Sequence, residues 1–232
     1  VWLDLLEPTV EEERLVEIRL GLDIPTREEM REIESSSRLY EEEGALYLTA
    51  TVVTKLDTML PENAQVTFIL KGSRLVTNRY VDPLPFRRFV AYAERHPQAN
   101  NNAPAVLAGL LESIINRIAD VIERVGIDMD GASAEVFNRN NLRNSHRRSQ
   151  RDFRKLLERI GQSGELIAKA RESLASLARL LAFLQQSTFN MPQDVRTRLR
   201  TLSKDVVAMS DHASFLGTNL NFVLDATLGM IN

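Results

Sequence analysis

The sequence predicts an α/β protein, with an N-terminal mixed, mostly antiparallel sheet flanked by helices, followed by long antiparallel helices and a C-terminal stalk helix. Strand-like segments rich in β-branched and aromatic residues are confined to about the first hundred residues. From Ala103 onward, apolar residues recur every three or four positions, as in helices. A last helical pattern starts near Pro192 and would be roughly 60 Å long. We therefore divide the chain into an α/β domain over 1–102, a helical hairpin over 103–190 and the stalk helix over 191–232.

The first forty residues are expected to form a strand and two capped helices. The opening VWLDL alternates large apolar and polar residues, which favours a strand. Thr9 is followed three residues later by Glu12, the spacing of a capping box, and helical periodicity follows. Thr26 and Glu29 repeat this spacing, which predicts a second, shorter helix reaching Ile33.

Four segments then complete the α/β domain. SRLYEEE reads as a charged edge strand, and ALYLTATVVTKL as a strand whose two faces are lined by Leu46, Leu48 and Ala50 and by Tyr47, Thr49 and Thr51. QVTFILKGSRLVTNRYV predicts a hairpin that turns at Lys71-Gly72-Ser73. PLPFRRFVAYAERH predicts a helix with Phe86, Phe89, Val90 and Ala93 on one side.

Two long helical patterns make up the predicted hairpin. The first begins at Ala103 and weakens near FNRNNLRNSHRRSQRD, and the second runs from Phe153 to Leu184. STFNMPQD then breaks the pattern as a turn. In the last residues, NFVLDATLGMIN, no Gly or Asn follows a basic last turn and no Pro comes after it, so the final helix is expected to continue past Asn232.

Composition excludes several classes of protein. The 232 residues are 44% hydrophobic and 26% charged, with a net charge of −3, which is ordinary for a globular protein and gives no overall attraction to nucleic acid. The absence of cysteine excludes disulfides, a thiol nucleophile and Cys-ligated metals. No signal peptide is expected at the N-terminus. The sequence contains no window of eighteen uncharged apolar residues, so no membrane span is predicted within it.

No catalytic chemistry is signalled. The histidines, His96, His146 and His212, are far apart and match no metal-binding spacing, and phosphate-binding loops and nucleophile elbows are absent from the sequence. The acidic run Glu41-Glu42-Glu43 has the carboxylates for a cation, but a solvated strand edge explains it more simply. We therefore expect that the protein is not an enzyme.

A basic cluster lies where the hairpin pattern weakens. Residues 139–159 contain eight Lys and Arg against two acidic residues, whereas residues 1–60 contain fifteen acidic residues against six basic ones. The cluster consists of Arg139, Arg143, Arg147, Arg148, Arg151, Arg154, Lys155 and Arg159. Because Phe153 is the single aromatic residue interleaved in this stretch for base stacking, nucleic acid is not the expected partner. Contact with an acidic protein surface or with lipid headgroups fits the cluster better.

One stripe of the final helix combines polar residues with a single carboxylate. Thr218, Asn221, Asp225, Leu228 and Asn232 are spaced by 3, 4, 3 and 4, and apolar residues cover much of the remaining surface. Such a stripe suits the inner wall of a ring, where carboxylate and amide oxygens face a hydrated cation. It is equally compatible with Asp225 on a solvated face.

Three segments resemble the CorA family of magnesium and cobalt transporters, in its proteobacterial branch. They are GLDIPTREEMREIESSSRLYEEEGALYLTATVV, GELIAKARESLASLARLLAFL and LNFVLDATLGMIN, and the resemblance extends over essentially the whole chain. It implies a cytoplasmic α/β domain and stalk, a homopentamer, and an inner-membrane location through membrane helices that follow the stalk. The family signature Gly-Met-Asn lies beyond the stalk, so the GMIN of this chain is not that signature.

The resemblance also implies residue roles in the stalk. Asp225 matches the position that forms a carboxylate ring in the cytoplasmic funnel, and Leu228 and Asn232 would line the pathway with it. Asn221 falls on the same expected pore-facing stripe.

Regulatory metal sites between subunits follow from the same resemblance. Mg²⁺ bound there would hold the pore closed, and the expected ligands in this chain are Asp57 with Asp205 or Asp211. Thr201 departs from the family pattern, because it stands where a stalk ligand is expected.

The resemblance predicts the regulatory and ion-funnel domain of a divalent-cation transporter that carries Mg²⁺ and Co²⁺ and is gated by cytosolic Mg²⁺. Two alternatives remain. One is the domain of a ZntB-type zinc transporter, which belongs to the same superfamily. The other is a soluble helical scaffold that binds partners through its long helices.

Overall fold

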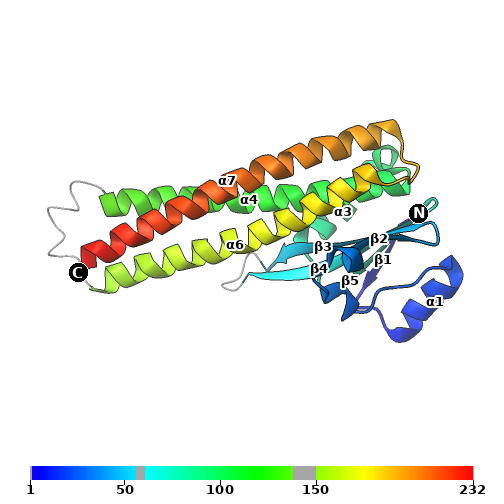
Figure 1. The fold of residues 1–232 in the computed structure, drawn as a ribbon, viewed down its shortest axis with the longest axis horizontal. Helices are drawn as coiled ribbons and strands as arrows, with labels where there is room; N and C mark the ends of the chain where they lie inside the picture. The colour runs from blue at the N-terminus through cyan, green and yellow to red at the C-terminus, as the bar shows by residue number, and fades with distance from the viewer. Residues whose placement is uncertain (1, 56–60, 138–149, 232) are drawn as a thin grey trace.

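The computed structural model describes residues 2–55, 61–137 and 150–231. Figure 1 shows an elongated molecule with a small sheet at one end. The long helices Ala103–Phe137, Gln150–Gln186 and Gln193–Ile231 lie side by side and extend well beyond that sheet. This arrangement confirms the predicted α/β fold with long helices.

The sheet has five strands, all within the first eighty residues. They are β1 (Trp2–Leu6), β2 (Leu39–Glu42), β3 (Ala45–Thr54), β4 (Glu62–Lys71) and β5 (Arg74–Arg79). Their order is β1-β5-β4-β3-β2, and only the β1–β5 pair is parallel. The predicted hairpin turn joins β4 to β5, where Gly72 has a φ of 57° that glycine adopts without strain.

Local capping shapes the N-terminal helices as the spacing predicts, with one difference. Helix α1 (Val10–Leu20) starts with a complete capping box between Thr9 and Glu12. Thr26 and Glu29 make the same reciprocal bonds. The segment they cap is the short 3₁₀ helix η1 (Glu29–Arg31), not an α-helix to Ile33, because its next bonds close i to i+3 turns. The four-residue helix α2 (Ser35–Arg38) leads into β2.

Both faces of β3 are buried along its whole length. Leu46, Leu48 and Ala50 join the large core formed with the long helices. Ala45 and Tyr47 join a smaller core on the opposite face, where Val16 and Leu20 of α1 pack. The sheet is therefore a middle layer between α1 and the long helices (Figure 1).

The helical part contains α3 (Leu84–Arg95), the short η2 (Pro97–Asn100), α4 (Ala103–Phe137), α6 (Gln150–Gln186) and α7 (Gln193–Ile231). Phe86 and Phe89 of α3 are buried as predicted, but Val90 is exposed. Helices α4, α6 and α7 bury one continuous apolar core along their length. The pattern break at STFNMPQD correctly marks the end of α6 and the start of α7, whereas most of FNRNNLRNSHRRSQRD lies outside the described residues.

Helix α6 completes an edge of the sheet. Strand β2 pairs only with residues Ala45–Leu48 of β3, so the later half of that edge needs other partners. The N–H of Thr51 donates to Oγ of Ser176 at 3.0 Å, and Oγ of Ser173 donates to the carbonyl of Thr51 at 2.7 Å. Next to them, the amide of Asn63 donates to Glu172 at 2.6 Å. These bonds join the sheet to the helical bundle through α6.

None of the described helices contains a stretch that is both long enough and apolar enough to cross a bilayer.

Gly109→Ala should destabilise the fold. Its Cβ would lie 2.9 Å from Cζ of the buried Phe89 ring and closer still to Cε2, so the ring would have to move. We expect a loss of about 1–3 kcal/mol in the free energy of unfolding, measured by chemical denaturation, because overpacking outweighs the gain in helix propensity. Gly131→Ala on the same helix is the control. Nothing lies within 4 Å of its Cβ, so it should stabilise by about 0.5–1 kcal/mol. Equal effects of the two substitutions would refute the packing argument.

Candidate functional site

Helix α7 has one buried face and one open face. Its buried apolar residues pack into the core with α4 and α6. These residues are Val195, Leu199, Leu202, Val206, Ala213, Leu216, Leu220 and Val223. The opposite face remains accessible over most of the helix.

The predicted polar stripe lies on the accessible part of α7. Thr218, Asn221 and Asp225 are exposed, and Leu228 is 45% exposed. The hydroxyl of Thr218 donates to the carbonyl of Ser214 and so is engaged within the helix. Asn232 lies outside the described residues. In a single chain, Asp225 therefore presents its carboxylate to solvent. The stripe is the inner wall of a ring if other copies of the chain face it, and a solvated surface if none do.

Large apolar side chains share this open face. Val207 is 56%, Phe215 64% and Phe222 61% exposed. The ring of Phe222 stacks on that of Phe137, at the end of α4, with centroids 5.5 Å apart. We call Val207, Phe215, Phe222 and Phe137 the aromatic face. The sequence showed that α7 is apolar nearly all round, but only the packing of α4 and α6 shows which residues remain uncovered.

The residues expected to bind regulatory metal are not brought together within the described chain. Asp205 and Asp211 are exposed on α7 and, six positions apart, point about 120° away from each other. Asp57 lies outside the described residues. Among the described ranges, no group of three His, Cys, Asp or Glu is placed to hold a metal ion. Thr201 is exposed, and its hydroxyl donates to the carbonyl of Thr197. An intersubunit metal site therefore stays a prediction.

An ion pair that the sequence did not indicate ties the start of α7 to α4. Both Nε and Nη2 of Arg198 donate to one carboxylate oxygen of Glu112, with the Nε contact at 2.9 Å. Both side chains are partly exposed. The contact fixes the rotation of the first turns of α7 against α4.

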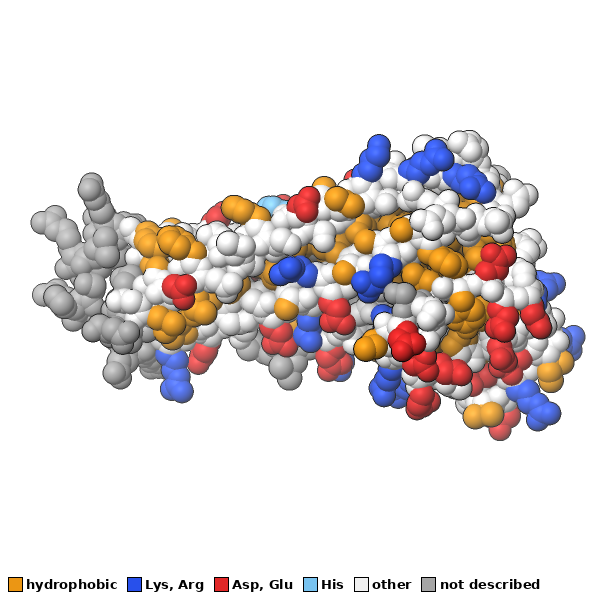
Figure 2. Space-filling view, in the orientation of Figure 1, with side chains coloured by type: hydrophobic (Ala, Val, Ile, Leu, Met, Phe, Trp, Pro, Cys, Tyr) orange, Lys and Arg blue, Asp and Glu red, His pale blue; other side chains and the backbone are white. Residues whose placement is uncertain are grey.

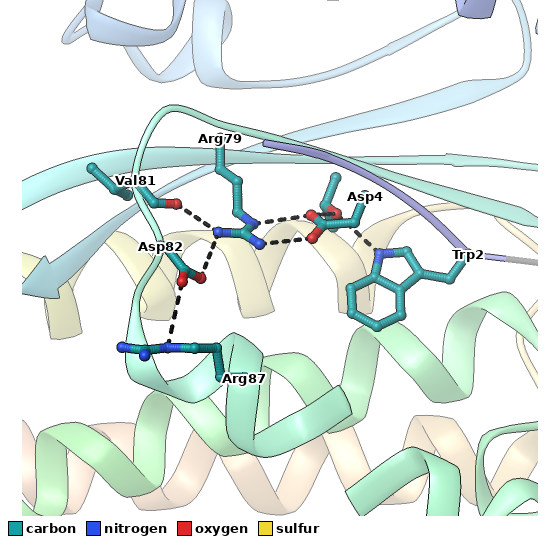
Figure 3. A network of polar contacts seen from close by, with 7 residues as sticks. Trp2, Asp4, Arg79, Val81, Asp82 and Arg87 are labelled. Carbon is teal, nitrogen blue, oxygen red and sulfur yellow. Dashed lines mark hydrogen bonds and ion pairs between the residues drawn. The ribbon is translucent and has the colours of Figure 1, made fainter. Parts of the chain in front are cut away.

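A buried arginine organises the end of the sheet at β1 and β5. Figure 3 shows the guanidinium of Arg79 held between Asp4 of β1 and Asp82 of the loop before α3. Arg79 donates to both oxygens of Asp4, at 3.0 and 2.7 Å, and to Asp82 at 3.0 Å. Burial lowers the pKa of Arg79, but the bonds and charges of Asp4 and Asp82 more than offset this, so its pKa is raised overall. Arg79 remains a buried, paired cation.

The same network continues on both sides. Arg87 lies 3.4 Å from the second oxygen of Asp82. Thr77 donates to Asp4, and the Trp2 indole donates to Thr77 (Figure 3). These contacts fix β1, β5 and the start of α3 relative to one another.

Acidic side chains gather over the sheet end of the molecule. Figure 2 shows several of them on one face there. The run Glu41-Glu42-Glu43 is exposed at the edge strand β2 and its turn, where the sequence placed a solvated edge. Beside it, the rings of Tyr40 and Tyr47 stack with centroids 4.6 Å apart.

The basic cluster and the histidines show no assembled site in the described chain. Arg159 pairs with Glu135 at 3.2 Å, and Arg154 lies 3.7 Å from Glu158. Lys155 is exposed. Arg139, Arg143, Arg147, Arg148 and His146 lie outside the described residues, and nothing is described of the Arg151 side chain. His96 and His212 are exposed.

Comparison with known proteins identifies relatives over the full chain. The model of the family described as CorA-like Mg2+ transporter protein matches residues 1–232. The magnesium transport protein CorA of Haemophilus influenzae is 28% identical over 232 residues, which cover all of this chain and 71% of that protein. CorA proteins of Pasteurella multocida and Salmonella typhimurium are 28% and 27% identical, with the same coverage.

Solved structures share the fold. The soluble domain of CorA from Methanocaldococcus jannaschii superposes with a TM-score of 0.77 at 14% identity, covering 99% of this chain and 88% of that chain. The complete CorA transporter of that organism gives 0.78 at 13%, covering 100% and 70%. The ZntB cytoplasmic domain from Vibrio parahaemolyticus gives 0.70 at 8%, covering 98% and 86%. At these identities the likeness shows the fold alone.

Stability should fall at alkaline pH because of Tyr40. Burial, followed by the charges of Tyr47, Glu42, Glu29 and Asp23, raises the pKa of Tyr40 from 10.0 to about 12. The unfolded chain therefore releases this proton near pH 10 and the folded chain only near pH 12, so stability is intact below pH 10 and falls as pH rises toward 12. Unfolding midpoints measured from pH 8 to 12 should show this fall. In Tyr40→Phe the fall should be smaller, and an unchanged fall would contradict the assignment.

Proposed function

The chain belongs to the CorA family of Mg²⁺ transporter proteins, and on that premise we propose that it is the cytoplasmic regulatory and ion-funnel domain of a divalent-cation transporter. The transported ion is Mg²⁺, with Co²⁺ as a further substrate. The intact protein is a homopentamer that is anchored in the inner membrane by segments that follow α7. The observation that carries the proposal is the open face of α7, with Asp225 and Asn221 beside large uncovered apolar side chains.

Carboxylate and amide oxygens suit the ion that such a pathway carries. Mg²⁺ gives up its water reluctantly, so it is best guided by oxygens that accept hydrogen bonds from its hydration shell. In a ring of copies, the Asp225 carboxylates would surround one axis and attract the hydrated cation. Asn221 would add amide oxygens on the same stripe, with Leu228 and Asn232 following it toward the end of the helix.

The aromatic face supports association between copies. Phe215 and Phe222 leave more than half of their surface in water, which costs about 1–2 kcal/mol for each ring relative to burial. Association through α7 would cover these rings and place the polar stripe toward the ring axis.

Gating would follow from the repulsion between carboxylates that association of the copies brings together. In this proposal, Mg²⁺ bound by Asp57 of one copy and by Asp205 or Asp211 of its neighbour offsets the repulsion between carboxylates. It thereby favours the closed, symmetric ring, and loss of Mg²⁺ shifts the population toward splayed subunits. Thr201 supplies no carboxylate, so the interface would hold its ion with fewer charges.

Zn²⁺ is the competing cation, because the ZntB cytoplasmic domain shares the fold. The greater sequence similarity to proteins named as magnesium transporters favours Mg²⁺. A flux assay with each ion separates these two functions.

Asp225→Ala in the intact transporter should reduce Mg²⁺ influx severalfold. Removing the carboxylate removes the local attraction for the hydrated cation. Influx into proteoliposomes, followed with a Mg²⁺-sensitive dye and repeated with Co²⁺ and Zn²⁺, measures the effect. Asp130→Ala, at an exposed carboxylate of α4, is the matched control and should transport normally. Unchanged flux in Asp225→Ala would remove Asp225 from the pathway.

Replacing Phe215 and Phe222 with Ser should weaken self-association of the chain, because the apolar area available for burial falls. Sedimentation equilibrium across a concentration series measures the association constant. Val10→Ser removes a residue of α1 that is 76% exposed and should leave that constant unchanged. A wild-type chain that stays monomeric throughout, or a double variant that associates as tightly as wild type, would exclude the aromatic face as the interface.

A further inference from the structure

A groove that the transport proposal does not use runs along one end of the sheet. It consists of two adjoining hollows of about 520 and 440 Å³. Arg27, Glu62, Tyr80 and Val81 line both hollows. This size is within the range of small-molecule sites.

The groove lies where strands end. Glu7 follows β1, Lys55 follows β3 and Tyr80 follows β5, and all three line it. Ligands of α/β proteins commonly bind beyond the carboxyl ends of parallel strands, which here are β1 and β5. Glu7 and Lys55 have φ values of 48° and 55°. Two of the three non-glycine residues with positive φ in the described chain therefore border this groove, and such conformations are enriched at functional sites.

Two of the three carboxylates that line the groove are already neutralised. Glu62 pairs with Lys55 at 2.9 Å. Asp82 pairs with the buried Arg79 and with Arg87 (Figure 3). Glu7 is the remaining acidic residue of the lining.

Two guanidinium groups of the groove lining are not neutralised by a carboxylate in the part of the chain that the structure describes. Arg27 and Arg31 are exposed on neighbouring turns, and no carboxylate of the described residues lies within ion-pair distance of either. The guanidinium of Arg27 lies over the Tyr80 ring, 5.3 Å from its centroid, which orients it. The hydroxyl of Tyr80 is fixed in turn by donating to Glu13 at 2.9 Å. Arg117 lines the larger of the two hollows.

The floor of the second hollow offers neutral polar groups. Asn63 and Gln65 line it, and both are half-buried. The side-chain oxygen of Asn63 is buried and has no hydrogen-bond partner among the described residues, whereas its amide nitrogen bonds to α6. Because this oxygen has almost no accessible surface, it offers no acceptor to a ligand in the groove, and recognition rests on the two arginines.

We propose that this groove binds a small phosphate-bearing anion. Arg27 and Arg31 make the charged contacts, since a guanidinium presents paired donors that match phosphate oxygens. The proposal does not depend on ion transport or on the oligomeric state.

Titration calorimetry of the 232-residue chain with inorganic pyrophosphate, without divalent cations, tests the site. Binding should weaken at least tenfold in Arg27→Gln and in Arg31→Gln, and it should weaken as salt is raised. Arg74→Gln is the matched control, because Arg74 is an exposed arginine at the opposite end of β5. It should bind pyrophosphate as wild type does.

Three results would overturn the proposal. The first is no heat and no shift of the unfolding midpoint at millimolar pyrophosphate. The second is equal affinity in wild type, Arg27→Gln and Arg31→Gln. The third is an equal loss in Arg74→Gln, which would mean that overall charge and not the groove governs binding. Circular dichroism of each variant establishes that a loss of binding does not come from unfolding.

Discussion

The fold depends on how the uncovered edge of β3 is satisfied. A strand that loses its neighbour exposes a row of backbone donors and acceptors, and these are costly to bury without partners. Strand β2 is too short to cover β3 beyond Leu48. Helix α6 takes over, because Ser176 accepts from the N–H of Thr51 and Ser173 donates to its carbonyl. Both serines are almost fully buried, so water does not substitute for them. The position of α6 on the sheet is thereby fixed, and α4 and α7 pack against a helix that is already part of the α/β layer.

The packing of α6 between the sheet and α7 explains why α7 carries the open face. Helix α6 contacts both the sheet and α7, whereas the core residues of α7 pack chiefly against α4 and α6. A helix on the outside of such a stack buries about half of its circumference. Apolar residues on the other half, such as Phe215 and Phe222, therefore stay largely in water unless another surface covers them. Asp225 lies among them, and its charge stays solvated in the single chain.

The sequence predicted the parts of this structure that depend on local rules. The capping boxes at Thr9 and Thr26, the Gly72 turn and the long helical periodicities each act within a few residues of the chain. It did not predict which face of a helix stays open, because that depends on which elements pack there. Phe222 and Leu220 are both apolar, yet only Leu220 meets the core. The Arg198–Glu112 pair and the groove beside Arg27 join residues distant in sequence, and no short-range pattern signals them.

The contacts of α7 differ along its length, and this bears on where it can move. Near its start, Arg198 is held by Glu112 through directional, charge-assisted bonds. Further along, the hydroxyls of Ser214, Thr218 and Thr227 bond to carbonyls of α7 itself and not to a neighbouring helix. The residues that face α4 and α6 there, such as Leu216 and Val223, make apolar contacts, which have no preferred direction. A small rotation or sliding of this half exchanges one apolar contact for another, whereas the same motion at Arg198 breaks an ion pair. Among the described residues, the half of α7 that carries Phe222 and Asp225 is therefore the half that can repack with the smaller loss of polar contacts.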